Sequence, residues 1–284
     1  MTTASRSDSV RGGGRAAGGP TATYAAPVAG NHVFADSMTM LRRNLVRAKR
    51  YPGMTFGVIV MPVVLMLMFN YIFGGALKTS TGNAHYIDYL TPGMMLMIPA
   101  YMLVGVAVSV ATDMTKGIVN RFRTMHISRS AMLTGQVVGT WIQGMIGVTL
   151  MTLVAVACGF RSHDAGIGKW LLAIAVVAAL IYALNWLGVA FGLVAKTPES
   201  ASNLPFPIVM LPFLGSGLVP TATMLTGVKQ FAEYQPFSPI AETVRGLLMG
   251  TPIGHNGFWA VGWILVLGLG GYFWSTALFR QKTA

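Results

Sequence analysis

Six long apolar runs divide this chain, and each approaches the roughly 20 residues that a helix needs to cross the hydrocarbon core of a bilayer. Their expected limits are 54–73, 89–111, 136–157, 170–195, 204–220 and 258–279. None of these ranges contains Asp, Glu, Lys, Arg or His. The pattern predicts an all-α integral membrane protein with six transmembrane helices, which together form one domain over residues 54–279.

The fifth run is the shortest and carries three prolines, Pro205, Pro207 and Pro212. Proline frees a backbone carbonyl, and in a membrane that carbonyl must find a partner in a neighbouring segment. We therefore expect this run to be kinked or broken, and to pack inside the bundle or line a cavity.

The two ends of the chain have a different composition from the apolar runs. Residues 1–35 are rich in Ser, Gly and Arg and lack the apolar run of a signal peptide, which predicts a flexible cytoplasmic tail. Residues 36–53 place Met38, Leu41, Leu45 and Ala48 on one helical face opposite a basic face, which predicts an amphipathic helix on the membrane interface. A basic flank that only sets the topology is the alternative. Residues 280–284 form a short cytoplasmic tail.

The segment 221–257, between the fifth and sixth runs, predicts a re-entrant helical hairpin on the outer side. Its first helix covers 225–234, with Val228, Phe231 and Ala232 facing inward. The second is expected to begin with Ser238 as N-cap and to end at Gly250. An apolar stripe runs along the second helix: Ile240, Val244, Leu247 and Leu248.

The candidate functional residues of this hairpin are Glu233, Pro239, Glu242 and Arg245. A plug or collar over the outer end is the functional interpretation. The alternative interpretation is that the hairpin merely lies on the lipid surface and has no function of its own.

Composition and charge agree with a membrane protein: 54% of the residues are hydrophobic and 10% are charged. With both termini on the cytoplasmic side, fifteen of the 20 Lys and Arg residues fall on that side, as the positive-inside rule requires. The formal charge of +12 therefore follows from topology and needs no nucleic-acid partner. Composition and charge together place the chain in a membrane with both termini on the cytoplasmic side.

Several kinds of chemistry have no residues to support them. The sequence has no P-loop motif for ATP, its five histidines are scattered, and no nucleophile has a base beside it. We expect no metal and no catalytic residue, and a packing role for the one cysteine, Cys158. Because the predicted spans lack ionisable groups, the energy for any transport should come from outside the chain.

A compact basic segment, residues 113–129, separates the second and third apolar runs. If it is helical, Ile118, Phe122 and Met125 share one face, and Lys116, Asn120 and Arg123 share another. Such a helix could bind a cytosolic partner through its basic face. A basic loop that merely orients the chain is equally consistent with the spacing.

The sequence of this segment resembles the ABC-2 type exporter permeases, and most of all their daunorubicin/doxorubicin-resistance type. Similar motifs follow in the same order along the chain at 69–75, 89–93, 193–200, 213–224 and 231–240. The chain departs from the family pattern at Met125-His126 and at Gly215 and Gly217, where bulkier residues are usual. These glycines could loosen the fifth span or make room for a substrate.

The resemblance implies a homodimer of six-span subunits, with two copies of a separate ABC ATPase that binds ATP and Mg. In that scheme residues 116–125 form the coupling helix, and Glu199 supports the contact. The residues implied in ATPase coupling are Lys116, Gly117, Ile118, Asn120, Arg121, Phe122, Arg123, Met125 and Glu199. The chain itself would be no enzyme and would bind no cofactor.

The resemblance also implies export of a hydrophobic or amphipathic substrate, such as an antibiotic, another polyketide or a lipid-linked molecule. A pathway at the dimer seam could use side chains of the second and fifth spans: Met94, Met95, Met97, Tyr101, Phe206, Met210 and Phe213. A passive pore or secondary transporter is an alternative function, and so is a membrane immunity protein that transports nothing.

Overall fold

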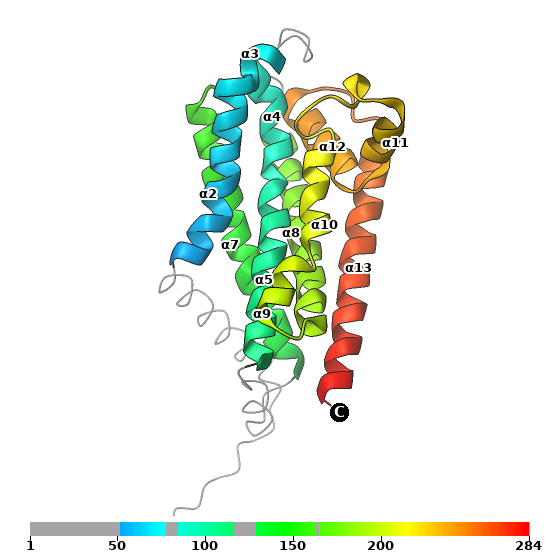
Figure 1. Cartoon of the computed structure of the whole chain (residues 1–284). Coiled ribbons are helices and arrows are strands. Elements are labelled where there is room, and N and C mark those ends of the chain that lie inside the picture. The colour runs from blue at the N-terminus through cyan, green and yellow to red at the C-terminus, as the bar shows by residue number, and fades with distance from the viewer. Residues whose placement is uncertain (1–51, 78–84, 116–128, 163–164, 284) are drawn as a thin grey trace, which may run out of the picture. The chain divides into compact units, whose positions relative to one another are not determined.

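The computed structural model describes residues 52–77, 85–115, 129–162 and 165–283 (Figure 1). Within these ranges every regular element is a helix, which confirms the all-α prediction for this part of the chain. The predicted tail 1–35 and all but the last two residues of the predicted interface helix 36–53 lie outside the described residues.

Four of the described helices are long and apolar enough to cross a membrane. They correspond to the second, third, fourth and sixth predicted spans. The first of them is built from α4 (Tyr86–Met95) and α5 (Met97–Thr115), and the others are α7 (Arg129–Ala157), α8 (Ile167–Val194) and α13 (Asn256–Thr283).

The helix of the second span is longer than predicted, and this corrects the expectation that the spans lack ionisable residues. It runs from Tyr86 to Thr115, so that it includes Asp88 near its start and Asp113 near its end. Both side chains are buried. The apolar run marks only the middle of the helix, because packing and hydrogen bonds allow its polar ends to be buried as well.

The first predicted span is helical throughout but irregular. The α-helix α2 (Pro52–Met68) passes into a π-helical turn at Phe69–Phe73 and then into α3 (Gly74–Leu77). Its described apolar stretch, Val60–Phe73, is shorter than the four long helices. The six-span count therefore stays a prediction.

The fifth predicted span is broken, as its prolines suggested. It contains α10 (Phe206–Met210) and a 3₁₀ turn at Leu211–Leu214, and the short helix α9 (Pro198–Asn203) precedes it. Gly215 is extended, and residues 216–218 form a turn. Pro205 and Pro212 each lie at a break between these pieces, where a continuous helix would need their missing N–H groups.

Helix α8 lies between α5 and α13, and glycines allow both contacts. A Cβ atom added to Gly188 of α8 would lie 2.9 Å from the Leu103 carbonyl oxygen of α5. One added to Gly192 would lie 2.6 Å from the Ala107 carbonyl oxygen of α5. This is the small-residue spacing, G-x-x-x-G, that lets transmembrane helices approach closely. On the other side, a Cβ added to Gly271 of α13 would meet the Leu187 backbone nitrogen at 2.7 Å.

Polar side chains also link the long helices. The Gln136 amide donates to the Ser109 hydroxyl at 3.2 Å, and the Asn185 amide donates to the Val137 carbonyl oxygen at 3.3 Å. Trp141 on α7 donates to the Ala178 carbonyl oxygen of α8 at 2.8 Å. Two of the neutral amides in the predicted spans thus hold helices together.

The two helices of the predicted hairpin are present as α11 (Thr226–Tyr234) and α12 (Phe237–Met249), while their re-entrant position on the outer side stays a prediction. Its apolar stripe is buried, and Gly250 ends α12 in the left-handed conformation, both as predicted. Two details were wrong. Helix α12 begins before Ser238, which lies in its first turn, and on α11 only Ala232 is buried while Val228 and Phe231 are exposed.

Candidate functional site

The candidate site has two parts, at opposite ends of the helices in Figure 1. The end where α9 lies is the predicted cytoplasmic end, and the end where α11 and α12 begin is the predicted outer end. The predicted coupling residues from Lys116 to Met125 lie outside the described residues. Glu199 is the one predicted coupling residue that the structure places.

Glu199 lies in the first turn of α9 and is exposed. A reciprocal capping box holds the start of this short helix, because Thr197 Oγ1 accepts from the Ser200 backbone N–H at 3.2 Å and Ser200 Oγ accepts from the Thr197 backbone N–H at 3.2 Å. The buried Ala201 packs with Ala107 and Ala111 of α5. Glu199 is thus fixed beside the end of α5, from which the predicted coupling segment continues.

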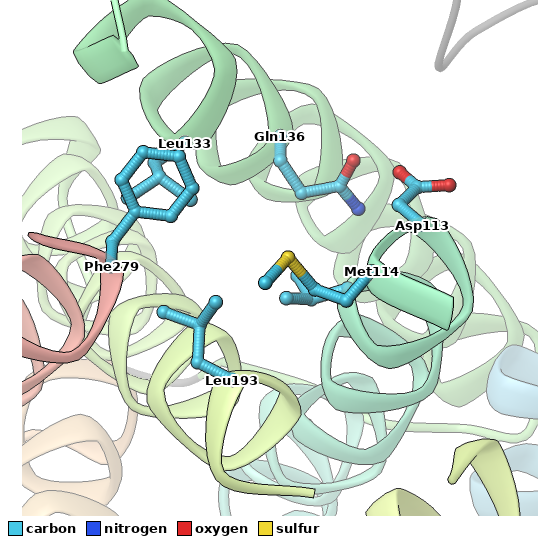
Figure 2. A pocket seen from close by; sticks show the side chains of 7 residues that line it. Asp113, Met114, Leu133, Gln136, Leu193 and Phe279 are labelled. Atoms are coloured by element: carbon cyan, nitrogen blue, oxygen red, sulfur yellow. The ribbon is translucent and has the colours of Figure 1, made fainter. Parts of the chain in front are cut away.

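A small pocket lies at the same end of the bundle (Figure 2). Its volume is about 10 Å³, roughly that of one water. The polar groups at its wall are the Asp113 carboxylate and the Gln136 amide, and the remaining lining is apolar: Val110, Met114, Leu133, Leu193 and Phe279. The pocket is too small for a drug-sized substrate.

The outer part of the site is built around Arg245 of α12, which is only 5% exposed. Its Nη2 donates to the carbonyl oxygens of Tyr89 at 3.2 Å and Ser216 at 3.0 Å, and its Nε donates to the Tyr89 carbonyl oxygen at 3.3 Å. Its Nη1 forms an ion pair with Glu242 one turn earlier. One guanidinium therefore joins α4, the segment after the broken fifth span, and α12.

Two tyrosines of α4 bind carbonyl groups of the same segment, residues 215–218. The Tyr86 hydroxyl donates to the Leu218 carbonyl oxygen at 2.9 Å, and the Tyr89 hydroxyl donates to the Ser216 carbonyl oxygen at 2.7 Å. These bonds satisfy carbonyl groups that no helix or strand pairs. Irregular backbone in a membrane protein requires such partners.

Ser238 and Gln235 complete the contact from the other side. The Ser238 hydroxyl accepts from the Ser216 backbone N–H at 3.0 Å and from the Gln235 amide at 2.9 Å. The side-chain oxygen of Gln235, Oε1, accepts from the Phe237 backbone N–H at 3.0 Å, at the start of α12. Ser238 thus serves the neighbouring segment instead of capping its own helix.

The two unusual glycines are explained by this packing. A Cβ added to Gly215 would lie 2.2 Å from the Gln235 side-chain nitrogen. Gly217 lies against Gly93 of α4, where an added Cβ would come within 2.1 Å of the Gly217 carbonyl oxygen. The space left by these glycines is therefore filled by the protein itself, and the expectation that they make room for a substrate was wrong. We call the joined residues Tyr86, Tyr89, Gly93, Ser216, Gly217, Gln235, Ser238, Glu242 and Arg245 the outer clamp.

The four predicted hairpin residues do not act together. Arg245 and Glu242 belong to the outer clamp, and Pro239 is buried in the first turn of α12. Glu233 is on α11, exposed, and pairs instead with Lys229 at 3.8 Å. Sequence reasoning missed Tyr86, Tyr89, Ser216 and Gln235, although polar residues beside apolar runs were a signal for them.

The predicted substrate residues separate into two groups. Met94, Met95 and Met97 are buried in the core of this one chain, so the prediction that they form a surface at a dimer seam was wrong. Tyr101, Met210 and Phe213 are half-buried, and Phe206 is 59% exposed. Of this set, the residues of the broken fifth segment are the better candidates for a contact outside the chain.

No group of three or more His, Cys, Asp and Glu side chains in the described ranges could hold a metal ion. The outer clamp holds segments together, since its tyrosine, arginine, glutamate and glutamine side chains bind backbone groups or one another, whereas the buried Ser216 hydroxyl has no hydrogen-bond partner among the described residues. It offers no nucleophile with an adjacent base.

Comparisons with known proteins agree with the resemblance of the sequence motifs. A family model described as ABC-2 type transporter matches residues 36–249. A daunorubicin resistance ABC transporter permease protein of Streptomyces coeruleorubidus is 30% identical over 236 residues, which is 82% of this chain and 81% of that protein. A Mycobacterium tuberculosis protein named "Probable doxorubicin resistance ABC transporter permease protein" is 23% identical over 227 residues, 77% of this chain and 79% of that protein.

Proposed function

We propose that this chain, which belongs to the ABC-2 type transporter family, is the permease subunit of an ATP-driven exporter whose ATPase is a separate protein. It is a multi-pass protein of the bacterial inner membrane. The observation that carries the proposal is the family match over residues 36–249, which includes α2 through α12. Permease subunits of this family are generally not enzymes themselves.

The proposed cargo is a hydrophobic or amphipathic molecule such as an antibiotic, another polyketide or a lipid-linked compound. Support comes from the names of the two relatives, which refer to daunorubicin and doxorubicin resistance. The cargo would leave the cytoplasm or the inner leaflet. ATP and Mg would bind to the ATPase and not to this chain.

The proposed ATPase contact is the segment Lys116 to Met125, with Glu199 beside it. The position of Glu199 supports this, because α9 packs against the last turns of α5 just before the segment begins. An amphipathic helix here would direct Phe122 and Arg123 to different partners, the first to a groove and the second to acidic side chains.

The proposed assembly is two copies of this chain with two ATPase copies. The exposed face of the broken fifth segment supports a second copy, since Phe206 is 59% and Leu214 is 46% exposed. Irregular backbone is not tolerated against lipid, and so this segment needs protein or a water-filled pathway beside it.

Co-purification with the cognate ATPase tests the proposed contact. The double variant Phe122→Ala with Arg123→Glu should lose the ATPase while still inserting into the membrane. Lys229→Ala, on the opposite end of the bundle, is the matched charge control and should retain it. Undiminished ATPase binding by the double variant would count decisively against the docking site.

Transport in proteoliposomes tests the function itself. With the ATPase and ATP present, export should depend on ATP, and the double variant should abolish it. Transport by the purified chain without the ATPase would instead support the passive pore or secondary transporter. Binding of the drug without any ATP-dependent movement would support the immunity protein.

A further inference from the structure

A second cavity, of about 160 Å³, lies between α7 and α8. Its walls come from Met145 to Leu153 on α7 and from Trp170 to Val177 on α8. Met95 and Leu248, both buried, form its inner side. The cavity is separate from the outer clamp and from the small pocket of Figure 2.

The lining of the cavity offers a ligand no free hydrogen-bond donor from its side-chain hydroxyl groups. Its two hydroxyls belong to Thr149 and Thr152, and each donates to a carbonyl oxygen of its own helix: Thr149 to Met145 at 2.8 Å and Thr152 to Val148 at 2.7 Å. Their donor capacity is therefore used within α7. A ligand in this cavity would find methyl, methylene, thioether and aromatic groups.

Two of the residues that line the cavity are exposed apolar side chains of long apolar helices. Leu153 of α7 is 60% exposed, Ile174 of α8 is also exposed, and so are the neighbouring Leu171 and Leu172 of α8. Exposed apolar side chains on a membrane-spanning helix can contact lipid. Trp170, half-buried at the start of α8, lies where tryptophan is enriched in membrane helices. A hydrocarbon chain can therefore enter directly from the lipid.

The volume limits what can bind. An apolar cavity of about 150 Å³ accommodates a benzene-sized group. A cavity of about 160 Å³ is then large enough for several methylenes of a flexible chain and too small for a fused-ring drug. Empty, it would leave Met95, Leu248 and Trp170 without packing partners on one side, which is unfavourable.

We propose that this cavity is a binding site for one acyl chain of a membrane lipid, held between α7 and α8. The site depends only on the location of the chain in a membrane and not on the ATPase or on the exported cargo. Its ligand chemistry is a saturated or unsaturated hydrocarbon chain, recognised by shape and by the absence of free polar groups.

Photolabelling of the full chain tests the site. The chain is placed in vesicles of phosphatidylglycerol and phosphatidylethanolamine in which some phosphatidylethanolamine carries a diazirine at the end of one acyl chain. After irradiation, labelled residues are located by peptide mass spectrometry. The peptides covering residues 145–153 and 170–177 should be labelled several-fold more than the equally lipid-facing surface of α13 around Leu265 and Leu269, both exposed.

Two cavity variants and one control make the test specific. Ala173→Phe fills the cavity from α8, and Ile174→Trp covers its opening from an exposed position, so that the second keeps the test valid if the first misfolds. Both should reduce the excess labelling to the level of α13. Ala179→Phe, exposed on the same helix, should leave it unchanged.

Three outcomes would overturn the proposal. They are labelling of the two peptides no stronger than that of α13, excess labelling that persists in both cavity variants, and excess labelling that Ala179→Phe removes as completely as the two cavity variants do.

Discussion

The guanidinium carbon of Arg245 lies 3.7 Å from the centroid of the Tyr89 ring, and the same guanidinium donates to the Tyr89 backbone carbonyl. The Tyr89 hydroxyl in turn donates to the Ser216 carbonyl oxygen, which Arg245 also binds. The two side chains thus bind the same carbonyl oxygen, that of Ser216 in the 215–218 segment. A buried charge that binds two carbonyls, a carboxylate and an aromatic face is well compensated.

Replacement of Arg245 should open the outer clamp. Arg245→Met keeps the volume but removes the charge and every donor, which should cost about 2–4 kcal/mol because Glu242 and two carbonyls lose their partner. The thermal midpoint of the purified chain should fall, and export should fall with it.

Matched variants separate this effect from a simple loss of charge. Arg245→Lys keeps the charge but lacks the planar fork, and should restore only part of the stability. Lys229→Ala breaks the exposed pair with Glu233 on the adjacent helix, which should cost about 0–1 kcal/mol. If Arg245→Met and Lys229→Ala behave alike, the outer clamp does not hold this end of the bundle.

The contact between Gly93 and Gly217 predicts an intolerance to any side chain. Gly93→Ala places a Cβ within 2.1 Å of the Gly217 carbonyl oxygen, and backbone cannot move aside as a flexible side chain can. We expect little folded protein by size-exclusion chromatography after extraction. Gly227→Ala on α11 has nothing within 4 Å and should fold normally. Normal yield of Gly93→Ala would show that α4 and the 215–218 segment are not in contact.

The packing of α5 on α8 gives a third prediction. Gly192→Ala adds a Cβ at 2.6 Å from the Ala107 carbonyl oxygen, and overpacking of this kind costs about 1–3 kcal/mol. Gly270→Ala on α13 has open space and should be neutral or slightly stabilising. Thermal unfolding followed by circular dichroism measures both, and equal midpoints would contradict the close approach of the two helices.

The lengths of the apolar runs in the sequence predicted the long helices well, because a helix that crosses a membrane needs an unbroken apolar run. It failed at their ends, where Asp88 is buried and its carboxylate accepts from the Arg161 backbone N–H at 2.9 Å. Such a hydrogen bond joins residues that are far apart in the sequence, and no local sequence pattern predicts it. The break in the fifth span could be predicted from its prolines, because a missing backbone N–H group is a local property of the sequence.

The outer clamp was only partly predictable for the same reason. Arg245 and Glu242 could be selected as charged residues in an apolar hairpin, but Tyr89 and Ser216 owe their role to contacts across more than 100 positions of the chain. The three methionines show the opposite error. Their adaptable side chains suit a binding surface, and equally suit the core in which they are buried.

The broken fifth segment predicts where two copies of the chain meet. In a background of Cys158→Ser, which removes the one native thiol, Phe206→Cys and Leu214→Cys place single thiols on the exposed face of this segment. Irregular backbone needs protein or a water-filled pathway beside it, and in the proposed dimer a second copy meets this segment. These thiols should then lie near their equivalents in the second copy and form disulfide-linked dimers on oxidation in membrane vesicles. Leu269→Cys is the control, because Leu269 is exposed on α13. This helix is continuous, so its backbone hydrogen bonds are satisfied within the helix and it can face lipid. A dimer band on a non-reducing gel for Phe206→Cys and Leu214→Cys, but not for Leu269→Cys, would support a dimer interface at the fifth segment. Equal bands for all three variants would indicate random collision. A band for Leu269→Cys alone would place the dimer interface on α13 instead.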